Sequence, residues 1–370
     1  MELDTFRREL DAWLDEQDFA HSVTATGNTG LDAHMAQLSK VKRHTYDAGW
    51  MRWGWPERVG GLGGSTLLRG YLGEALTSRD LVEPGIYSMT EVLAPTMIDY
   101  ARPELAAEMV PRLLRGDETW CQGFSEPGTG SNLAALTCRA VRDDDGWRVT
   151  GQKVWTSLAQ YAQRCVLLTR TGDAGHGGIT ALFVDMDAPG ITVRPIETMH
   201  GQPEFCEVFF DDVDVPIERM LGDEGQGWSV AMDLLPFERS TSLWHRGAFL
   251  QQRLQRLVEV SPSVPTDELG DVIVQLFALR ACSRATQYRM AAGERLGPET
   301  SVDKVLLATT EQAVFDLVAD SLDVLTGDDV DTERWRSDFL YSRAATIYGG
   351  SAEIQRNVLA RRVLQLGPEA

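Results

Sequence analysis

The chain has 370 residues, with 35 Lys and Arg against 55 Asp and Glu, which gives a formal net charge of −20 at pH 7. This length is long for one core and favours two or three packed domains. A content of 43% hydrophobic and 24% charged residues excludes wholesale disorder. The acidic balance argues against a nucleic-acid partner, because binding of a phosphate backbone depends on clustered Lys and Arg.

Cysteine usage and the apolar runs indicate where such a chain works. Five cysteines are widely spaced, without the pattern of a disulfide framework or a zinc site, so we expect reduced thiols and no metal. The first ten residues lack the basic and apolar regions of a secretory signal. No apolar run approaches the roughly twenty residues that cross a bilayer. We therefore expect a soluble, cytoplasmic protein with no membrane span.

The first 118 residues have the spacing of helices. Apolar side chains recur every three or four residues near the start of the chain and again over residues 67–75. Residues 53–65 are too rich in Gly and Pro to be anything but a loop. A further helix is predicted to begin at Pro103 and to end with Gly116 as its C-cap.

From about residue 119 to residue 226 the period of the apolar residues changes to two, which is typical of strands. Residues 139–155 predict a hairpin that turns at Asp145 and Gly146. Further strands are expected at residues 165–168, 179–186, 191–193 and 206–210. Several short strands in series favour a small barrel or a sandwich.

The helical period returns at about residue 227 and lasts to the end of the chain. One apolar stripe covers residues 272–279, and another covers residues 305–325 with Ser301 in an N-cap position. The last helix is predicted to run through residues 354–364. The order helices, strands, helices is the main architectural prediction.

Two short motifs suggest familiar sites but do not complete them. Gly128 and Gly130 could begin a dinucleotide fingerprint, but the third glycine position holds Leu133 and no βαβ unit surrounds it. Residues 123–127 have the outline of a nucleophile elbow, except that Pro127 replaces the last glycine. A Rossmann domain and a serine hydrolase are therefore both disfavoured.

Four ordered segments carry a more specific signal. They are WCQGFSEPGTGSNLAAL (120–136) with GQKVWTS (151–157), VFFDDVDVP (208–216), GDEGQGW (222–228) and IYGGSAEIQRNVLARRVLQLG (347–367). Together they resemble the acyl-CoA dehydrogenase family over essentially the whole chain. The resemblance implies an α+β fold with an all-α N-terminal domain (1–118), a central β-barrel or sandwich domain (119–226) and a C-terminal four-helix bundle (227–370).

The resemblance also implies a cofactor, FAD, and the residues that bind it. A loop of Gly, Ser and Thr lets backbone amides approach a cofactor closely, and its hydroxyls add directional hydrogen bonds. Trp155 taken alone would be a strand aromatic packed in a barrel, but its motif favours a position against the flavin. Ser131 matches a contact to the pantetheine arm of CoA. The residues implied at FAD are Phe124, Ser125, Trp155, Ser157, Ser351 and Glu353.

The family reaction removes hydrogen from C2 and C3 of an acyl thioester and needs a carboxylate base in a dry pocket. Many members carry that glutamate directly after the tyrosine of the C-terminal motif, where this chain has Gly349. A minority takes the base from a helix at the start of the C-terminal domain, and Glu238 stands there, before Arg239. We expect Glu238 to be the base and Arg239 to lie near the substrate. The alternatives are a solvated helix-face acid and a surface salt bridge. The Gly349 N–H remains able to bind the thioester carbonyl.

A second departure concerns the far end of the cofactor and the partners. The family's Arg-x-x-Phe-Gly motif, which binds FAD across a subunit boundary, is absent from residues 260–300. A homodimer, a homotetramer and an unequal heterotetramer all remain open. The resemblance implies an acyl-CoA or related thioester as substrate and an electron-transfer flavoprotein as acceptor. The alternatives are a partner subunit with little activity of its own, an enzyme for carrier-protein thioesters and a flavin monooxygenase.

Overall fold

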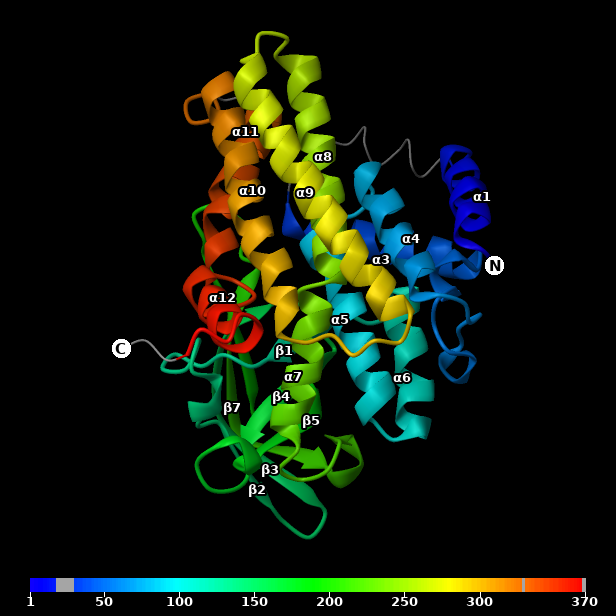
Figure 1. Ribbon diagram of the computed structural model, residues 1–370. Coiled ribbons are helices and arrows are strands. Elements are labelled where there is room, and N and C mark those ends of the chain that lie inside the picture. Colours follow the sequence, from blue (N-terminus) through cyan, green and yellow to red (C-terminus); the bar gives the residue numbers. More distant parts are fainter. Residues whose placement is uncertain (18–29, 328–329, 368–370) are drawn as a thin grey trace.

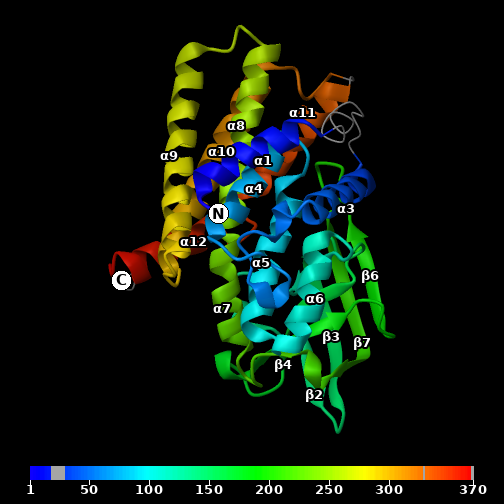
Figure 2. The same cartoon turned by 90° about the vertical axis from the view of Figure 1, so that its right-hand side faces the viewer.

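The computed structural model describes residues 1–17, 30–327 and 330–367. Helices of the N-terminal part, a central sheet and a long C-terminal bundle follow one another along the chain (Figure 1). The bundle rises above the sheet in both views, and α12 lies at the end of the bundle nearest the sheet (Figures 1 and 2). The predicted class and order of elements are confirmed.

The N-terminal helices bury most of their apolar side chains against one another. The predicted cap at Gly116 is confirmed, since this residue has φ +79° and its N–H bonds to the carbonyls of Arg112 and Leu113. Residues 53–65 form the predicted loop, with one short 3₁₀ turn inside it (Glu57–Val59) and another just before it (Trp50–Arg52). The helices are α1 (Leu3–Asp15), α3 (Leu31–Asp47), α4 (Thr66–Ser78), α5 (Pro84–Tyr100) and α6 (Pro103–Arg115).

Eight strands then form a single hydrogen-bonded sheet. Its order is β6-β7-β3-β2-β4-β5-β8, and β1 pairs with β4. The predicted hairpin is confirmed, because β2 and β3 pair antiparallel from Arg139–Thr150 to Arg142–Trp147. The strands are β1 (Trp120–Gly123), β2 (Arg139–Arg142), β3 (Gly146–Ser157), β4 (Arg164–Arg170), β5 (Ile179–Asp185), β6 (Ile191–Ile196), β7 (Phe205–Pro216) and β8 (Met220–Leu221).

The C-terminal helices agree with the predicted stripes, except at one cap. Ser301 does not cap α10 but is its first residue, because a 3₁₀ turn over Pro298–Thr300 precedes the helix and Thr300 takes the cap position. The last α-helix ends at Val358, and a π-helical turn follows it over Leu359–Val363. The helices are α7 (Gly227–Glu238), α8 (Thr241–Val260), α9 (Thr266–Ala291), α10 (Ser301–Ser321), α11 (Val330–Ser342) and α12 (Ala352–Val358).

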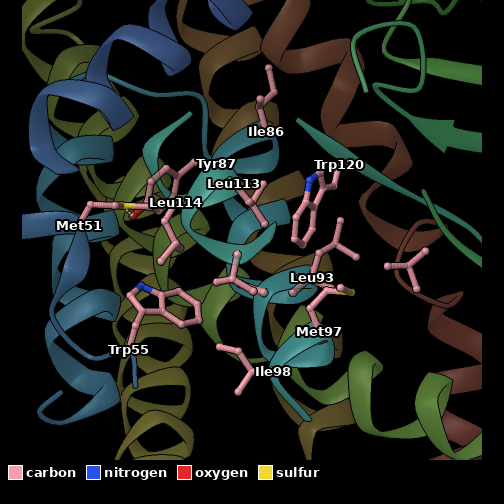
Figure 3. Close-up of a cluster of buried hydrophobic side chains, with 14 of the residues drawn as sticks. Met51, Trp55, Ile86, Tyr87, Leu93, Met97, Ile98, Leu113, Leu114 and Trp120 are labelled. Carbon is pink, nitrogen blue, oxygen red and sulfur yellow. Dashed lines mark hydrogen bonds between the residues drawn. The ribbon is translucent and has the colours of Figure 1, made fainter. Parts of the chain in front are cut away.

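A shared core joins the N-terminal helices to the sheet. Trp120 of β1 is fully buried and points toward Leu93 and Met97 of α5 (Figure 3). Its ring lies edge-on to Phe183 of β5 at 4.9 Å between centroids, and its indole N–H donates to Glu118 at 2.9 Å. A buried aromatic with a satisfied N–H contributes both apolar area and orientation. These contacts fix the sheet against α5 and thereby fix the start of the loop that follows β1.

Two glycines let α8 pack closely on α4. A Cβ on Gly73 would lie 2.1 Å from Nε2 of His245, and a Cβ on Gly70 would lie 2.9 Å from the ring of Trp244. Any larger residue there would separate the two helices. His245 is consequently fully buried, and this burial lowers its pKa to about 4.

This histidine is expected to make stability fall with acid. Unfolded His245 takes up a proton near its ordinary pKa of 6.5, whereas the folded group stays neutral to about pH 4, so stability is lost as pH falls through that window. The loss between pH 7.5 and pH 5 should be about 2 kcal/mol. Urea unfolding at both pH values measures it. His245→Gln should flatten this dependence, whereas a change at the exposed His44 should leave it; equal slopes in all three proteins would refute the assignment.

The cysteines and helices bear on the remaining expectations. All five cysteines are free thiols, four of them buried. Within the described ranges, no group of three or more His, Cys, Asp or Glu side chains could hold a metal ion. None of the helices in that part of the chain is both long and apolar enough to cross a membrane.

Candidate active site

A buried ion pair between Lys153 and Glu126 fixes the loop after β1 against β3. Lys153 of β3 is fully buried, and its Nζ lies 2.8 Å from Glu126 and 3.1 Å from the Phe124 carbonyl. The Glu126 carboxylate also accepts from the backbone N–H groups of Thr137 and Cys138. Burial opposes its ionised form, but Lys153 and these N–H groups hold its pKa below the ordinary value. The backbone of residues 124–126 is thereby fixed against β3.

The end of β3 carries a backbone irregularity with an exposed aromatic on it. The register between β3 and β7 shifts between Lys153 and Thr156, and Trp155 inside this bulge has φ +58°. Its side chain is 58% exposed. A bulky residue in the left-handed region is strained, and such strain concentrates at functional sites. The structure therefore does not bury Trp155 in the sheet, which removes the packed-aromatic alternative.

The loop before β7 joins this bulge to the C-terminal bundle. The N–H of Leu158 donates to the Glu204 carbonyl at 2.8 Å. Four residues earlier, the His200 ring lies edge-on to Tyr341 of α11, with 5.1 Å between centroids. Tyr341 in turn lies 5.9 Å from the ring of Tyr348. A continuous set of contacts thus runs from the end of β3 to the C-terminal turn.

Tyr348 begins a turn of two glycines in left-handed backbone. Gly349 and Gly350 have φ +63° and +93°, which a side chain would strain. The Tyr348 hydroxyl donates to Glu311 at 3.3 Å, and Arg246 holds the same carboxylate with hydrogen bonds of 2.7 and 2.9 Å. The turn is therefore fixed against α8 and α10. Among the described residues the Gly349 N–H bonds to no acceptor, so it can donate to a ligand.

Glu238, the last residue of α7, lies directly beside this turn. A Cβ on Gly349 would stand 3.1 Å from Glu238 Oε1 and 3.3 Å from Cε of Lys304. The other carboxylate oxygen, Glu238 Oε2, is buried and accepts no hydrogen bond within the described part of the chain. The carboxylate thus occupies the space into which a side chain at position 349 would extend. It also keeps an oxygen without a protein partner.

Arg239, the residue after Glu238, forms a hydrogen bond to the same two-glycine turn. Its Nε donates to the Gly349 carbonyl at 3.4 Å, and burial lowers its pKa against the opposing effect of Glu238. Among the described side chains it forms no ion pair, so the surface salt bridge left open by the sequence does not form. A role toward CoA stays a prediction.

The neighbouring carboxylates differ in their fitness as a base. Burial, with a contribution from Glu83, raises the pKa of Glu204 to about 8, so this group is protonated at neutral pH. Glu311 is occupied by Arg246. Glu238 has the unpartnered oxygen and lies at the two-glycine turn, so it is the best-placed proton acceptor of the three.

The other residues predicted to bind FAD or the substrate lie on three different segments. Phe124 is buried, and the carbonyl of Ser125 accepts from Val154 at 2.9 Å, which fixes both on the loop of β1. Ser157 pairs with Phe205 next to the bulge. Ser351 caps α12 through a bond to the Ile354 N–H, while Ser131 and Glu353 are exposed. The structure brings the β1 loop and the bulge together, and Glu238 and Gly349 together. The contacts of Ser131 and Glu353 toward a ligand stay predictions.

The residues present fit the flavin end of FAD. Thr129 Oγ1 is buried in the β1 loop without a hydrogen-bond partner among the described residues, and Trp155 presents an exposed aromatic surface next to Ser157. An orphaned hydroxyl and an exposed ring are what a planar, hydrogen-bonding ligand would satisfy. In the region where the Arg-x-x-Phe-Gly motif is missing, Arg289 forms ion pairs with Glu294 and Glu299. This arginine is therefore not free to bind the adenosine end of FAD.

Sequence reasoning missed three residues of this region. Lys153 lies under the β1 loop, Lys304 lies beside Glu238, and Glu204 lies between the bulge and Tyr341. The signal for the first two is composition, since the chain has only four lysines among its 35 Lys and Arg, and a lysine in an apolar strand or helix stands out. No pattern in the sequence distinguishes Glu204 from the many solvated acids.

The order of helical domain, sheet and helical bundle agrees with comparisons that place the chain among flavoprotein dehydrogenases of acyl thioesters. Family models agree in the same order: "Acyl-CoA dehydrogenase, N-terminal domain" matches residues 5–117, the middle domain residues 121–213 and the C-terminal domain residues 225–364. The chain belongs to the acyl-CoA dehydrogenase family. It is a flavin-dependent enzyme with FAD as its cofactor.

Curated relatives and solved structures agree with this family. The acyl-CoA dehydrogenase IpdE1 of Mycobacterium tuberculosis is 35% identical over 384 residues, covering 100% of this chain and 99% of the relative. The steroid ACAD Tcur3481–Tcur3483 matches with a TM-score of 0.84 at 25% identity, covering 100% of this chain and 98% of the other. The ChsE4–ChsE5 complex of M. tuberculosis matches with a TM-score of 0.80 at 25% identity, with the same coverage.

Proposed function

We propose that this chain oxidises the C2–C3 bond of an acyl-CoA to the trans-2-enoyl-CoA, with Glu238 as the base. One observation carries this proposal: the carboxylate of Glu238 lies beside Gly349, 3.1 Å from the place of a Cβ there. A base delivered from α7 can thus act at the position from which a glutamate on the turn would act. Its buried oxygen, which accepts no hydrogen bond from the described residues, supports a role in proton abstraction.

Each group of the chain has one task in this mechanism. The Gly349 N–H donates to the thioester carbonyl and stabilises the negative charge that develops on its oxygen. Glu238 then takes the α-proton and becomes neutral, while the C2–H bonding electrons form the new double bond. When bound, FAD supplies the acceptor for the hydride that leaves C3. Arg239, bonded to the Gly349 carbonyl, keeps the turn in register with the carboxylate.

The substrate that we propose is a steroid-derived acyl-CoA, and the working form is a complex with a second, related chain. The likeness to the steroid ACAD Tcur3481–Tcur3483 and to the ChsE4–ChsE5 complex supports both points. The absence of the Arg-x-x-Phe-Gly motif from residues 260–300 supports a partner that completes the adenosine end of the FAD site. An electron-transfer flavoprotein as acceptor and a cytoplasmic location remain part of the proposal.

Anaerobic reduction of the bound flavin tests the function. The FAD-loaded protein, with its partner where one is needed, should lose its visible absorbance on addition of an acyl-CoA. We expect a steroid propionyl-CoA to reduce it at least tenfold faster than octanoyl-CoA or isobutyryl-CoA. Equal rates for all three would contradict the proposed substrate class. A protein that stays fully yellow with every thioester would contradict the reaction itself.

A further inference from the structure

Helix α9 carries apolar side chains on two sides, and only one of these sides packs against the rest of the chain. The helix contacts α4, α8 and α10, and the side chains that pack on the inner side, such as Val272, Leu276 and Leu279, are buried. In Figure 2, α9 forms one edge of the bundle. A helix that is hydrophobic all round is normally buried all round. Within the described part of the chain, the outer side of α9 has no such cover.

The uncovered apolar residues form one stripe along the helix, which we call the α9 face. It consists of Gly270, Ile273, Val274, Phe277, Ala281 and Tyr288. These positions recur every three or four residues and therefore lie on one side of the helix. The four large side chains are exposed by 50% at Ile273, 68% at Val274, 75% at Phe277 and 52% at Tyr288. A continuous exposed apolar surface of this kind marks a site of contact with another protein.

The two ends of the α9 face carry opposite charge. Asp267, Glu268 and Asp271 lie in the first two turns of the helix, and Arg284 lies toward its other end. None of these four side chains forms an ion pair with another described residue. An apolar face with an acidic end and a basic end is complementary to the same face turned end over end. The charges therefore favour a second copy of this chain as the occupant.

We propose that two copies of this chain bind each other through their α9 faces, with the two helices antiparallel about a two-fold axis. Residues at equal distances from such an axis meet across the contact, because both helices rise by the same amount per residue. With the axis midway between Val274 and Phe277, each Val274 meets the Phe277 of the second copy. Gly270 then meets Ala281, and two small residues let the helices approach closely.

The same register pairs the charges at the two ends. Asp267 and Arg284 stand equally far from the axis in opposite directions, so each Asp267 lies level with the Arg284 of the second copy. An apolar centre with a charged rim is the usual anatomy of a protein interface. Charges at the rim select the partner and the register more than they add affinity. This inference does not use the proposed reaction, so either can fail without the other.

Light scattering after size exclusion tests the contact on the FAD-loaded full chain, with its partner where one is needed. The assembly should contain two copies of the 41.0 kDa chain joined by this contact, or a multiple of two. Phe277→Glu puts a charge in the centre of the face and should raise the dissociation constant about a hundredfold or more, so that the mass halves. Gln275→Glu is the matched control, because it places a carboxylate on an exposed position of α9 outside the face.

Reversal of the end charges shows which molecule covers the face. Arg284→Asp should weaken the contact about tenfold, because it sets like charges against each other at both ends. Adding Asp267→Arg to the same chain should return the dissociation constant to within about threefold of normal, since each copy then supplies both new charges. A different chain on the α9 face would not change its own charges, so the second substitution would not rescue the first. All of these positions are exposed, so the variants should keep the fold.

The outcomes decide between a second copy and any other occupant. The proposal holds if the mass halves in Phe277→Glu, stays normal in Gln275→Glu, and the doubly reversed chain pairs again. An unchanged mass in Phe277→Glu overturns it, and so does an unmodified assembly that contains one copy of this chain. Loss of the contact in Arg284→Asp without rescue by Asp267→Arg also overturns it, because the face would then bind a different chain.

Discussion

Replacing Glu238 by Gln is expected to slow flavin reduction by an acyl-CoA about a thousandfold while FAD remains bound. Glutamine has the size of glutamate but cannot take a proton, and Glu238 is the carboxylate next to the Gly349 turn with an unpartnered oxygen. Loss of a sole general base contributes about three powers of ten, or about 4 kcal/mol of activation free energy. Anaerobic stopped-flow absorbance of the flavin measures the rate constant.

The matched control for this variant is Glu259→Gln, a change of the same chemistry at an exposed position of α8. Its reduction rate should equal that of the unmodified protein. The visible spectrum before mixing reports FAD occupancy, so that loss of cofactor is not mistaken for loss of the base. A reduction rate within threefold of normal in the occupied Glu238→Gln protein would rule out Glu238 as the base.

The second large effect is expected at the ion pair under the β1 loop. Lys153→Met should lower the free energy of unfolding by about 3–5 kcal/mol, because it leaves the Glu126 carboxylate buried without its cation. The two side chains are 0% and 4% exposed, and their atoms lie 2.8 Å apart. Urea unfolding followed by tryptophan fluorescence measures the change. FAD binding should weaken with it, since Lys153 also bonds to the Phe124 carbonyl.

An exposed pair in the same domain gives the contrast. Arg142 and Glu224 lie 3.2 Å apart but are 58% and 47% exposed. Solvent screens such a pair, so Arg142→Met should cost less than about 1 kcal/mol. If the two variants were destabilised equally, burial would not be what makes the Lys153 pair important.

Much of the fold was predictable because local chemistry decides it. Gly116 ends a helix because a glycine adopts φ +79° without strain. Gly146 begins β3 for a different reason, since a Cβ there would lie 2.3 Å from the Val215 carbonyl oxygen. Ser301 failed as a cap because the neighbouring Pro298 starts a 3₁₀ turn that brings Thr300 to that position. The way the strands share one sheet depends on long-range pairing, such as β1 with β4, which no local pattern encodes.

The sequence predicts which residues form the candidate site but not how they are arranged in space. Motifs placed Glu238 and Gly349 in one region, but they lie 111 positions apart, and only packing of α7 on the C-terminal turn places the carboxylate beside the glycine. The rarity of lysine marks Lys304 in the sequence, but its place beside the Gly349 turn, like the place of Glu204, could not be predicted from spacing. Their roles arise from burial and from neighbours on other elements, which spacing along the chain does not report.

A crystal structure with FAD and an unreactive acyl-CoA analogue bound tests the central claim most directly, by the distance from the α-carbon to each nearby carboxylate. We predict that a Glu238 oxygen lies about 3–3.5 Å from the α-carbon, as a near-attack geometry requires, and that the Gly349 N–H donates to the thioester carbonyl. An α-carbon that faces Glu204 instead, with Glu238 beyond reach of its hydrogens, would contradict the account.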